Sequence, residues 1–251
     1  MFTEAQMLRY ARHIVLPEIG GAGQARLLAS SVLLIGAGGL GSPLLLYLAA
    51  AGVGRLGIAD PDTVELANLH RQIAHPTGSI GRRKTDSARA AAEALNPEVV
   101  VELHPVRVTA DNARALVEGY DLVADGSDNF ATRACVQTAC LAARRPLVSA
   151  AVQGFEGQLA TFKAHLGPPH PCYRCLFPEP PRAGLIPSCA QGGILGPAAG
   201  VVGSLQAVEV VKELLGLEPS LSGRLLLYDA LEARLQAIRL ERRPGCPECG
   251  Q

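Results

Sequence analysis

Short apolar runs alternate with longer amphipathic segments through the first 150 residues of the chain. Runs of this length with few polar residues are typical of strands that are buried on both faces of a sheet. We predict strands at residues 31–35, 56–59, 99–103, 122–124 and 147–150, and helices at residues 3–16, 40–51, 83–95, 110–118 and 129–143. This alternation favours βαβ crossovers, and therefore an α/β fold with a mostly parallel sheet and helices on both faces.

The pattern changes after Gln153. A strand is predicted at residues 158–162, and a segment rich in proline and cysteine follows over residues 165–187. A helix at residues 198–215 and two strands at residues 224–228 and 234–240, which we expect to be antiparallel, complete the fold. Because no internal repeat or low-complexity segment divides the chain, we expect residues 1–251 to form one domain.

Two uncharged windows, residues 27–54 and 183–208, are long enough to suggest a membrane span. Glycines interrupt both windows, and Pro187 and Pro197 also interrupt the second, at points where lipid could not satisfy the backbone. We therefore expect buried strands and helices at these positions, and no contact with a membrane.

The charge balance excludes a general attraction to polyanions. Lysine and arginine total 23, aspartate and glutamate also total 23, and the formal net charge is zero. We therefore expect no nucleic-acid partner. The chain has seven cysteines, an odd number, and its first residues do not resemble a secretion signal. We expect a cytoplasmic protein whose thiols bind a metal or do chemistry instead of forming a disulfide framework.

A glycine-rich turn follows the first predicted strand. Residues 36–41 read GAGGLG, which places Gly36, Gly38, Gly39 and Gly41 between a strand and a helix. The N-terminal N–H groups of such a helix can face a phosphate, and Asp60 at the end of the second strand can accept a hydrogen bond from a ribose. This combination predicts a nucleotide site with a Rossmann-like fold, and a glycine turn that serves packing alone is the alternative.

Several cations follow this turn in the sequence. They lie in the segments NLHRQ, residues 68–72, and GRRK, residues 81–84. Hydride transfer needs few of these charges, whereas a triphosphate needs them, so the sequence favours ATP over NAD. Asp128 follows the fourth strand, at the edge where parallel sheets bind ligands, and its carboxylate could hold Mg²⁺. We interpret Arg82 and Arg83 as solvated surface residues.

Cysteine pairs occur at two places far apart in the chain. Cys172 and Cys175 form one C-x-x-C pair, and Cys246 and Cys249 form the other. Four thiolates suit a tetrahedral Zn²⁺, but the separation of the pairs also allows two redox dithiols or two metal sites. The six histidines show no metal-like pairing, and we expect structural roles for them, with the exception of His70 inside NLHRQ.

The ordered motifs GAGGLG, DPDTVELANLHRQ, GRRK and DGSDN resemble those of the MoeB/ThiF/HesA family of adenylating enzymes, which are relatives of the ubiquitin-activating enzymes. The resemblance covers nearly the whole chain. It implies an adenylyltransferase that uses ATP to activate the C-terminal glycine of a ubiquitin-like sulfur-carrier protein ending in Gly-Gly, releases pyrophosphate, and serves molybdopterin or thiamine biosynthesis. It also implies a homodimer.

The resemblance assigns roles to individual residues. The nucleotide and Mg²⁺ would be bound by Gly36, Gly38, Gly39, Gly41, Asp60, Asp62, Asn68, Arg71, Gln72, Lys84, Asp128 and Asn129. Arg71, Lys84, Mg²⁺ held by Asp128, and Arg12 from the neighbouring subunit would neutralise the charge that develops on phosphate. The attacking carboxylate is already ionised at neutral pH, so no general base is needed.

The family also carries a structural zinc at matching cysteine pairs, which implies Zn²⁺ at Cys172, Cys175, Cys246 and Cys249. We expect Cys135 and Cys140 to be buried, inert thiols. Cys189 stands where some relatives have a thioester- or persulfide-forming cysteine, and it is a candidate nucleophile with a structural thiol as the alternative.

Three other functions remain as alternatives. The glycine turn and Asp60 also suit an NAD(P) oxidoreductase, and an adenylating fold can serve as a non-catalytic scaffold that binds carriers. An adenylating relative acting on a tRNA base is disfavoured because the chain has no basic tract. Because the chain stops at Gln251, with no room for an added sulfurtransferase domain, we expect a separate sulfur donor.

Overall fold

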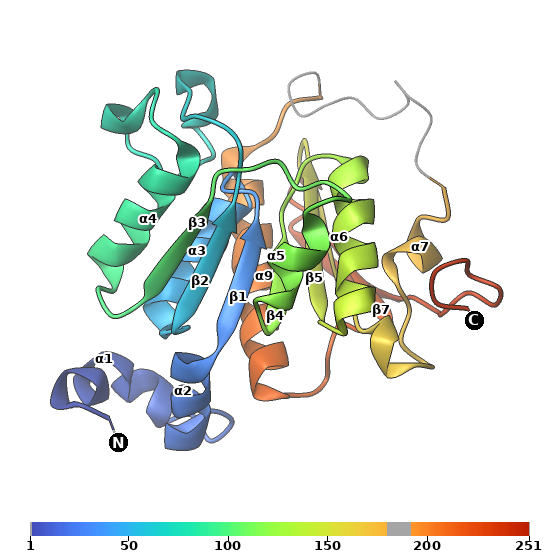
Figure 1. The fold of residues 1–251 in the computed structure, drawn as a ribbon, viewed down its shortest axis with the longest axis horizontal. Coiled ribbons are helices and arrows are strands. Elements are labelled where there is room, and N and C mark those ends of the chain that lie inside the picture. The colour runs from blue at the N-terminus through green and yellow to red at the C-terminus, as the bar shows by residue number, and fades with distance from the viewer. Residues whose placement is uncertain (1, 180–191, 251) are drawn as a thin grey trace.

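The computed structural model describes residues 2–179 and 192–250. Within them one sheet of eight strands runs in the order β3-β2-β1-β4-β5-β6-β7-β8 (Figure 1). The strands are β1 (Ser31–Ile35), β2 (Arg55–Ala59), β3 (Val100–His104), β4 (Leu122–Asp125), β5 (Leu147–Gln153), β6 (Glu156–Phe162), β7 (Arg224–Asp229) and β8 (Arg234–Arg239). Neighbours from β3 to β5 are parallel, and β6, β7 and β8 are added antiparallel. The predicted Rossmann-like fold with antiparallel C-terminal strands is confirmed.

Helices cover both faces of the sheet (Figure 1). One face packs against α3 (Gly41–Ala51), α4 (Lys84–Leu95) and α9 (Gly196–Leu215), and the other against α5 (Ala113–Glu118) and α6 (Phe130–Ala143). In β1, Val32 and Leu34 join the first core, while Leu33 and Ile35 join the second. Since successive side chains of a strand point to opposite faces, a strand covered on both sides must be apolar throughout.

The N-terminal helices lie at the amino ends of the parallel strands. Helix α1 (Glu4–Ile14) begins at Thr3, whose side chain accepts the Gln6 N–H while the Gln6 side chain accepts the Thr3 N–H. This capping box satisfies two of the free N–H groups at the start of the helix. The sequence pattern did not predict α2 (Gly20–Ala29), which begins with glycines and has no side-chain cap. Helix α2 leads directly into β1, and thus lies opposite the glycine turn (Figure 1).

The remaining predicted elements are present with shifted ends. Strands β5 and β6 are longer than predicted because they pair with each other over their full length, from Leu147 opposite Phe162 to Gln153 opposite Glu156. In its described part the proline- and cysteine-rich segment contains the end of a 3-10 helix (Ala164–Leu166) and the short helix α7 (Tyr173–Leu176). Among the helices of the described residues, none is both long and apolar enough to cross a membrane.

Candidate functional site

A cavity of about 790 Å³ opens at the carboxyl ends of the parallel strands. Its walls include the turn after β1 and the carboxyl ends of β2 and β4. They also include the first residues of β6 and β8 and the last residues of β7. Among the residues predicted to bind nucleotide, those that line it are Gly36, Gly38, Gly39, Asp60, Asp62, Arg71, Gln72, Lys84, Asp128 and Asn129. The fold therefore brings together at one edge residues that are up to 93 positions apart, from Gly36 to Asn129.

The glycine turn after β1 depends on close backbone contacts. Gly36 has a φ of +92°, which favours glycine, and it packs against the backbone of Gly126. A Cβ at Gly41 would lie 2.0 Å from the carbonyl oxygen of Gly36. Gly41 does not line the cavity but closes the turn at the start of α3, so its absent side chain sets the shape of the loop at the cavity.

Asp60 is buried beside this turn. Its Oδ2 accepts the Ala37 N–H at 2.8 Å, and its Oδ1 accepts the Asp62 N–H at 2.9 Å. Burial raises the pKa of the Asp60 carboxyl, while the positive charge of Lys84 and these two N–H groups oppose the rise. Asp60 thus fixes the turn to the end of β2 and lines the cavity at the same time.

Lys84 is the first residue of α4, and its side chain is buried in the cavity wall. Its Nζ donates to Asp62 Oδ2 at 2.9 Å. The Asp62 side chain is more than half exposed, so water screens much of this ion pair. The ammonium group of Lys84 is therefore held at the cavity in advance. An anionic ligand can reach it without breaking a buried salt bridge, because the Asp62 side of the ion pair is exposed to water.

Arg71 lies across the glycine turn. Its Nη2 donates to Asn68 Oδ1 at 2.8 Å, and a Cβ at Gly39 would lie 3.4 Å from its Cγ. Asn68 is not on the cavity wall, and the structure shows it orienting Arg71. Gln72 is buried, and its Oε1 has no hydrogen-bond partner within the described ranges. This segment presents a guanidinium to the cavity from a fixed position.

Asp128 and Asn129 lie on the loop between β4 and α6. The Asn129 side chain caps α6 by accepting the Thr132 N–H at 2.9 Å, and its Nδ2 lies 3.3 Å from Asp128 Oδ1. The fully buried Asp125 holds the same loop by accepting the Ser127 N–H at 2.9 Å. The exposed Asp128 carboxylate thus lies at the cavity on a backbone that is fixed on both sides.

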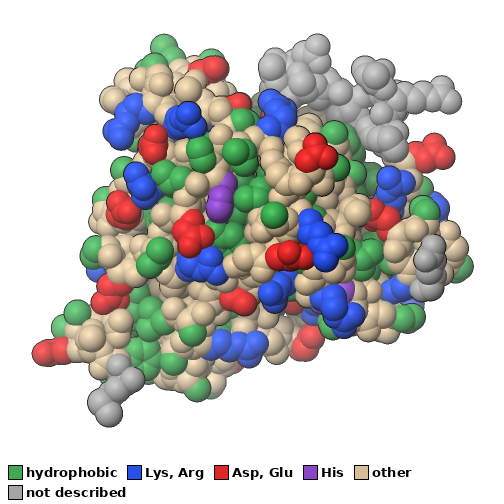
Figure 2. Space-filling model, viewed as in Figure 1, with side chains coloured by type: hydrophobic (Ala, Val, Ile, Leu, Met, Phe, Trp, Pro, Cys, Tyr) green, Lys and Arg blue, Asp and Glu red, His purple; other side chains and the backbone are tan. Residues whose placement is uncertain are grey.

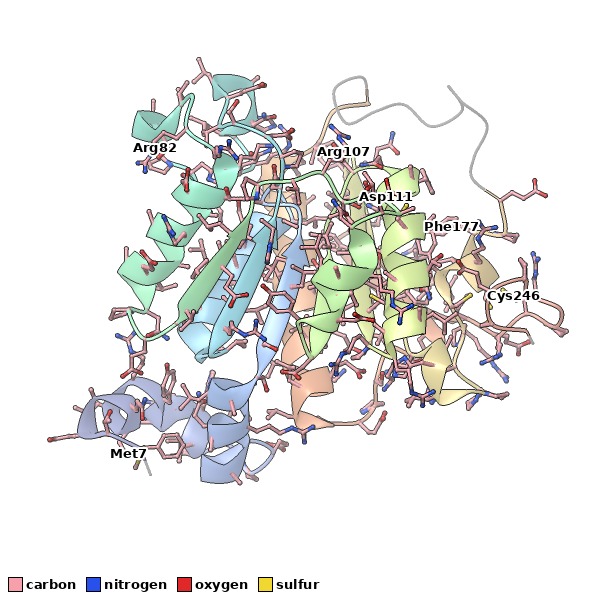
Figure 3. All side chains as sticks on the ribbon, viewed as in Figure 1. Met7, Arg82, Arg107, Asp111, Phe177 and Cys246 are labelled. Carbon is pink, nitrogen blue, oxygen red and sulfur yellow. The ribbon has the colours of Figure 1, made fainter. Side chains whose placement is uncertain are left out.

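Arg12 is not brought to this cavity within one chain. It is exposed on α1, at the end of the molecule opposite the cavity. In Figure 3, Met7 of the same helix lies far from Arg107, which lines the cavity. Cys189 lies outside the described residues.

Sequence reasoning missed the second half of the cavity wall. Val106, Arg107 and Val108 line it from the segment after β3, and Gln158, Tyr228, Arg234 and Gln236 line it from β6, β7 and β8. None of these residues belongs to a short motif. For the residues on β6, β7 and β8, the alternation of side chains along each strand was the one signal in the sequence that could have placed them on the same face. His75, for which the sequence predicts a structural role, is buried and does not line the cavity.

The two cysteine pairs meet at one point. The sulfur atoms of Cys172, Cys175, Cys246 and Cys249 all lie within 4.8 Å of one another. The Sγ–Sγ distances are 3.8 Å for Cys172–Cys175, 3.6 Å for Cys172–Cys246 and 3.4 Å for Cys175–Cys249. A tetrahedral zinc with Zn–S bonds of about 2.3 Å separates its sulfurs by about 3.8 Å, so the four thiols fit one zinc ion. Two separate metal sites do not fit this arrangement. Cys140 is buried among apolar residues, as predicted, and burial raises the pKa of its thiol. The prediction that Cys135 is buried as well is wrong, because its side chain on α6 is only partly covered.

The fold and the cavity define a Rossmann-like α/β protein with a cavity at the carboxyl ends of its parallel strands and a four-cysteine cluster packed against α6. The chain belongs to the ThiF family, whose sequence pattern it matches over residues 10–248. The family resemblance inferred from the motifs is thereby confirmed.

Curated relatives match almost the whole chain. The sulfur carrier protein adenylyltransferase of Thermus thermophilus is 49% identical over 251 residues, which cover 99% of this chain and 93% of that protein. The adenylyltransferase and sulfurtransferase MOCS3 of Bos taurus is 53% identical over 250 residues, covering 99% of this chain and 54% of that protein. The chain therefore spans about half the length of the MOCS3 relative.

Solved structures of lower identity share the fold. A crystal structure of E. coli MccB with ATP aligns with a TM-score of 0.83 at 21% identity, covering 97% of this chain and 75% of that one. A crystal structure of MccB with MccA-N7isoASN also aligns with a TM-score of 0.83. These likenesses support the Rossmann-like architecture independently of the motifs.

Proposed function

We propose that this protein is an adenylyltransferase that activates the C-terminal glycine of a ubiquitin-like sulfur-carrier protein in the cytoplasm, for molybdopterin or thiamine biosynthesis. A carboxylate oxygen of the glycine attacks the α-phosphorus of ATP, the bond to the β-phosphate oxygen breaks, and pyrophosphate leaves. The products are a carrier acyl-adenylate and pyrophosphate. The convergence of Arg71, Lys84 and Asp128 on one cavity is the observation that carries this proposal, and the names of the curated relatives support it.

Each cavity residue has a distinct role in this reaction. The N–H groups of the glycine turn and the start of α3 receive the phosphates, and Asp60 receives the ribose hydroxyls. Arg71 and Lys84 lower the repulsion between the attacking carboxylate and the α-phosphate, and they stabilise the charge on leaving pyrophosphate. Asp128 would hold Mg²⁺, which supplies further charge neutralisation when bound. Fixed charges of this kind act without reorganisation at the moment of reaction.

The carrier tail has a route to the α-phosphate along the antiparallel strands. Gln158 on β6 and Arg234 and Gln236 on β8 line the same cavity as the glycine turn. Backbone-rich Gly-Gly tails offer amide groups and little side-chain volume, which suits a wall of amide and guanidinium groups. On this side the cavity would therefore bind an extended peptide end, with its carboxylate directed toward Arg71.

A second copy of the chain would complete the site through Arg12. An apolar stripe of Val201, Leu205 and Val208 follows one side of α9, and Val208 is 58% exposed. Tyr47 on the neighbouring α3 is 59% exposed. Exposed apolar faces on packed neighbouring helices are typical of an interface between subunits. A homodimer built on this face would bury the stripe and leave α1 free to bring Arg12 to the partner's cavity.

The four-cysteine cluster would bind a structural zinc. It lies outside the cavity wall, and its four sulfurs fill a tetrahedral shell with no position left for water or substrate. The zinc would fix the chain end near α7 and take no part in the adenylation. Cys189, a candidate nucleophile in thioester or persulfide chemistry, lies outside the described residues and stays a prediction.

The proposal is tested by mixing the protein with Mg-ATP and candidate carriers, followed by mass spectrometry. An added mass of AMP on one carrier, absent when its last glycine is deleted, is the expected result. Thermal stabilisation by NADH but not by Mg-ATP would instead point to an oxidoreductase. Stabilisation by a carrier with no adenylate formed would point to a non-catalytic scaffold.

A further inference from the structure

A buried histidine connects the glycine turn to α4. His75 lies between Gln72 and the short helix at Thr77–Ser79, and it is 4% exposed. Its Nε2 lies 2.8 Å from the Ala37 carbonyl oxygen, and its Nδ1 lies 3.0 Å from Ser87 Oγ on α4. Both ring nitrogens are therefore engaged, and His75 does not itself line the cavity.

The partners fix the tautomer of this histidine. A carbonyl oxygen can only accept, so Nε2 carries a hydrogen and donates to Ala37. In the neutral ring Nδ1 then accepts from the Ser87 hydroxyl. Burial lowers the pKa of His75, the charge of Lys84 lowers it further, and the Ala37 carbonyl and the Asp60 charge oppose the change. The environment thus favours the neutral ring with a fixed direction of donation.

This donation determines the orientation of the peptide between Ala37 and Gly38. In a trans peptide the C=O and the N–H point in opposite directions. Because the Ala37 C=O points inward to His75, the Gly38 N–H points the other way, and Gly38 lines the cavity. No acceptor for the Gly38 N–H occurs within residues 2–179 and 192–250. On the other side of Ala37, its own N–H is held by Asp60 at 2.8 Å.

We propose that His75 is a positioning residue for ATP. Its ring holds the Ala37–Gly38 peptide so that the Gly38 N–H faces a phosphate. This inference rests on the proposed function, because it requires a nucleotide phosphate in the cavity. His75 acts through the backbone and touches no substrate. Loss of its hydrogen bond frees the peptide to rotate and leaves the Ala37 carbonyl buried without a donor. The affinity for the phosphate part of the nucleotide falls as a consequence.

The discriminating experiment compares the binding of Mg-ATP with that of adenosine by calorimetry. We expect His75→Leu to weaken Mg-ATP binding by about tenfold, the loss of one hydrogen bond to a charged group, while adenosine binding changes by less than about twofold. His75→Gln keeps an N–H donor that can reach Ala37 and an oxygen for Ser87, so we expect it to recover most of the affinity. A role in packing alone would weaken both ligands equally.

The chain offers a matched control in a second histidine–serine pair. His170 Nδ1 lies 2.8 Å from Ser222 Oγ, and neither residue lines the cavity. We expect His170→Leu to leave the ratio of the two affinities unchanged. If His75→Leu is poorly folded by circular dichroism, His75→Gln and Ser87→Ala supply the comparison.

The outcomes distinguish a failure of the role of His75 from a failure of the proposed function. The first case is a wild-type protein that binds Mg-ATP. If His75→Leu then binds Mg-ATP equally well, or loses affinity equally for both ligands, the role of His75 is overturned and the proposed function is not. Wild-type protein that does not bind Mg-ATP overturns the proposed function together with this role.

Discussion

Gly41→Ala tests the shape of the phosphate-facing turn by adding a single carbon atom. The added Cβ would lie 2.0 Å from the Gly36 carbonyl oxygen. Carbon and oxygen atoms that are not bonded approach to about 3.2 Å, so the turn would have to open by about 1 Å. Overpacking of this kind costs about 1–3 kcal/mol of folding free energy. A displacement of about 1 Å in a reacting group lowers catalysis by about a hundredfold.

We therefore expect Gly41→Ala to fold with reduced stability in urea, and to lose about a hundredfold in carrier-dependent exchange between ATP and pyrophosphate. Gly21→Ala is the matched control, because its Cβ would meet only Phe2 Cε2, at an ordinary 3.8 Å. On α2 the change should be neutral or stabilise the fold by up to about 1 kcal/mol, and leave the exchange unaffected. Wild-type exchange in Gly41→Ala would refute the reasoning that this contact sets the turn.

Four further substitutions test the cavity and the four-cysteine cluster. Asp128→Ala and Arg71→Ala should each abolish the exchange without lowering the melting temperature, because Asp128 is exposed and Arg71 bonds only locally; near-normal exchange in either variant removes that residue from the mechanism. Cys249→Ser, or a chelator, should release about one zinc per chain and lower the melting temperature, and protein purified without a tag that contains no zinc contradicts this. Since the folded-state pKa of Asp60 is raised above 3.8, its ionisation is less favourable in the folded state. The contribution of Asp60 to the free energy of unfolding therefore falls as the pH rises from 3.8 through the raised pKa of the folded state. Asp60→Asn should remove this pH dependence from the free energy of unfolding measured in urea. An unchanged pH dependence contradicts a raised pKa at Asp60.

Elements with a local signal were predicted correctly from the sequence. The run from Ser31 to Ile35, the glycine turn and α3 are each determined by residues close together in the chain. Helix α2 was missed because its first residues are glycines and no side chain caps it, so its stability comes from packing, with Leu27 fully buried in the core. Tertiary contacts of this kind leave no short pattern.

The candidate site likewise contains residues that short motifs identify and residues that only the tertiary structure places there. Arg71, Lys84 and Asp128 could be named from motifs, but Gln158 and Arg234 reach the cavity only because β6 and β8 extend the sheet antiparallel. His75 was expected to be structural, and its partners Ala37 and Ser87 are 38 and 12 residues away. Charge is mixed over the face seen in Figure 2, where basic and acidic side chains are interspersed, in keeping with the zero net charge.

The four-cysteine cluster has a consequence for the unfolded chain. A zinc ion held by its four thiols would join positions 74 residues apart, and the loop between these positions includes α9, β7 and β8. A cross-link over a loop of this length removes conformational entropy from the unfolded chain worth about 4 kcal/mol at room temperature. The glycine turn lies outside the loop, so this cross-link would constrain β7 and β8, which line one side of the cavity, and would leave the glycine turn to fold on its own contacts. Loss of the metal should therefore first release the side of the cavity to which the proposed function assigns the carrier tail.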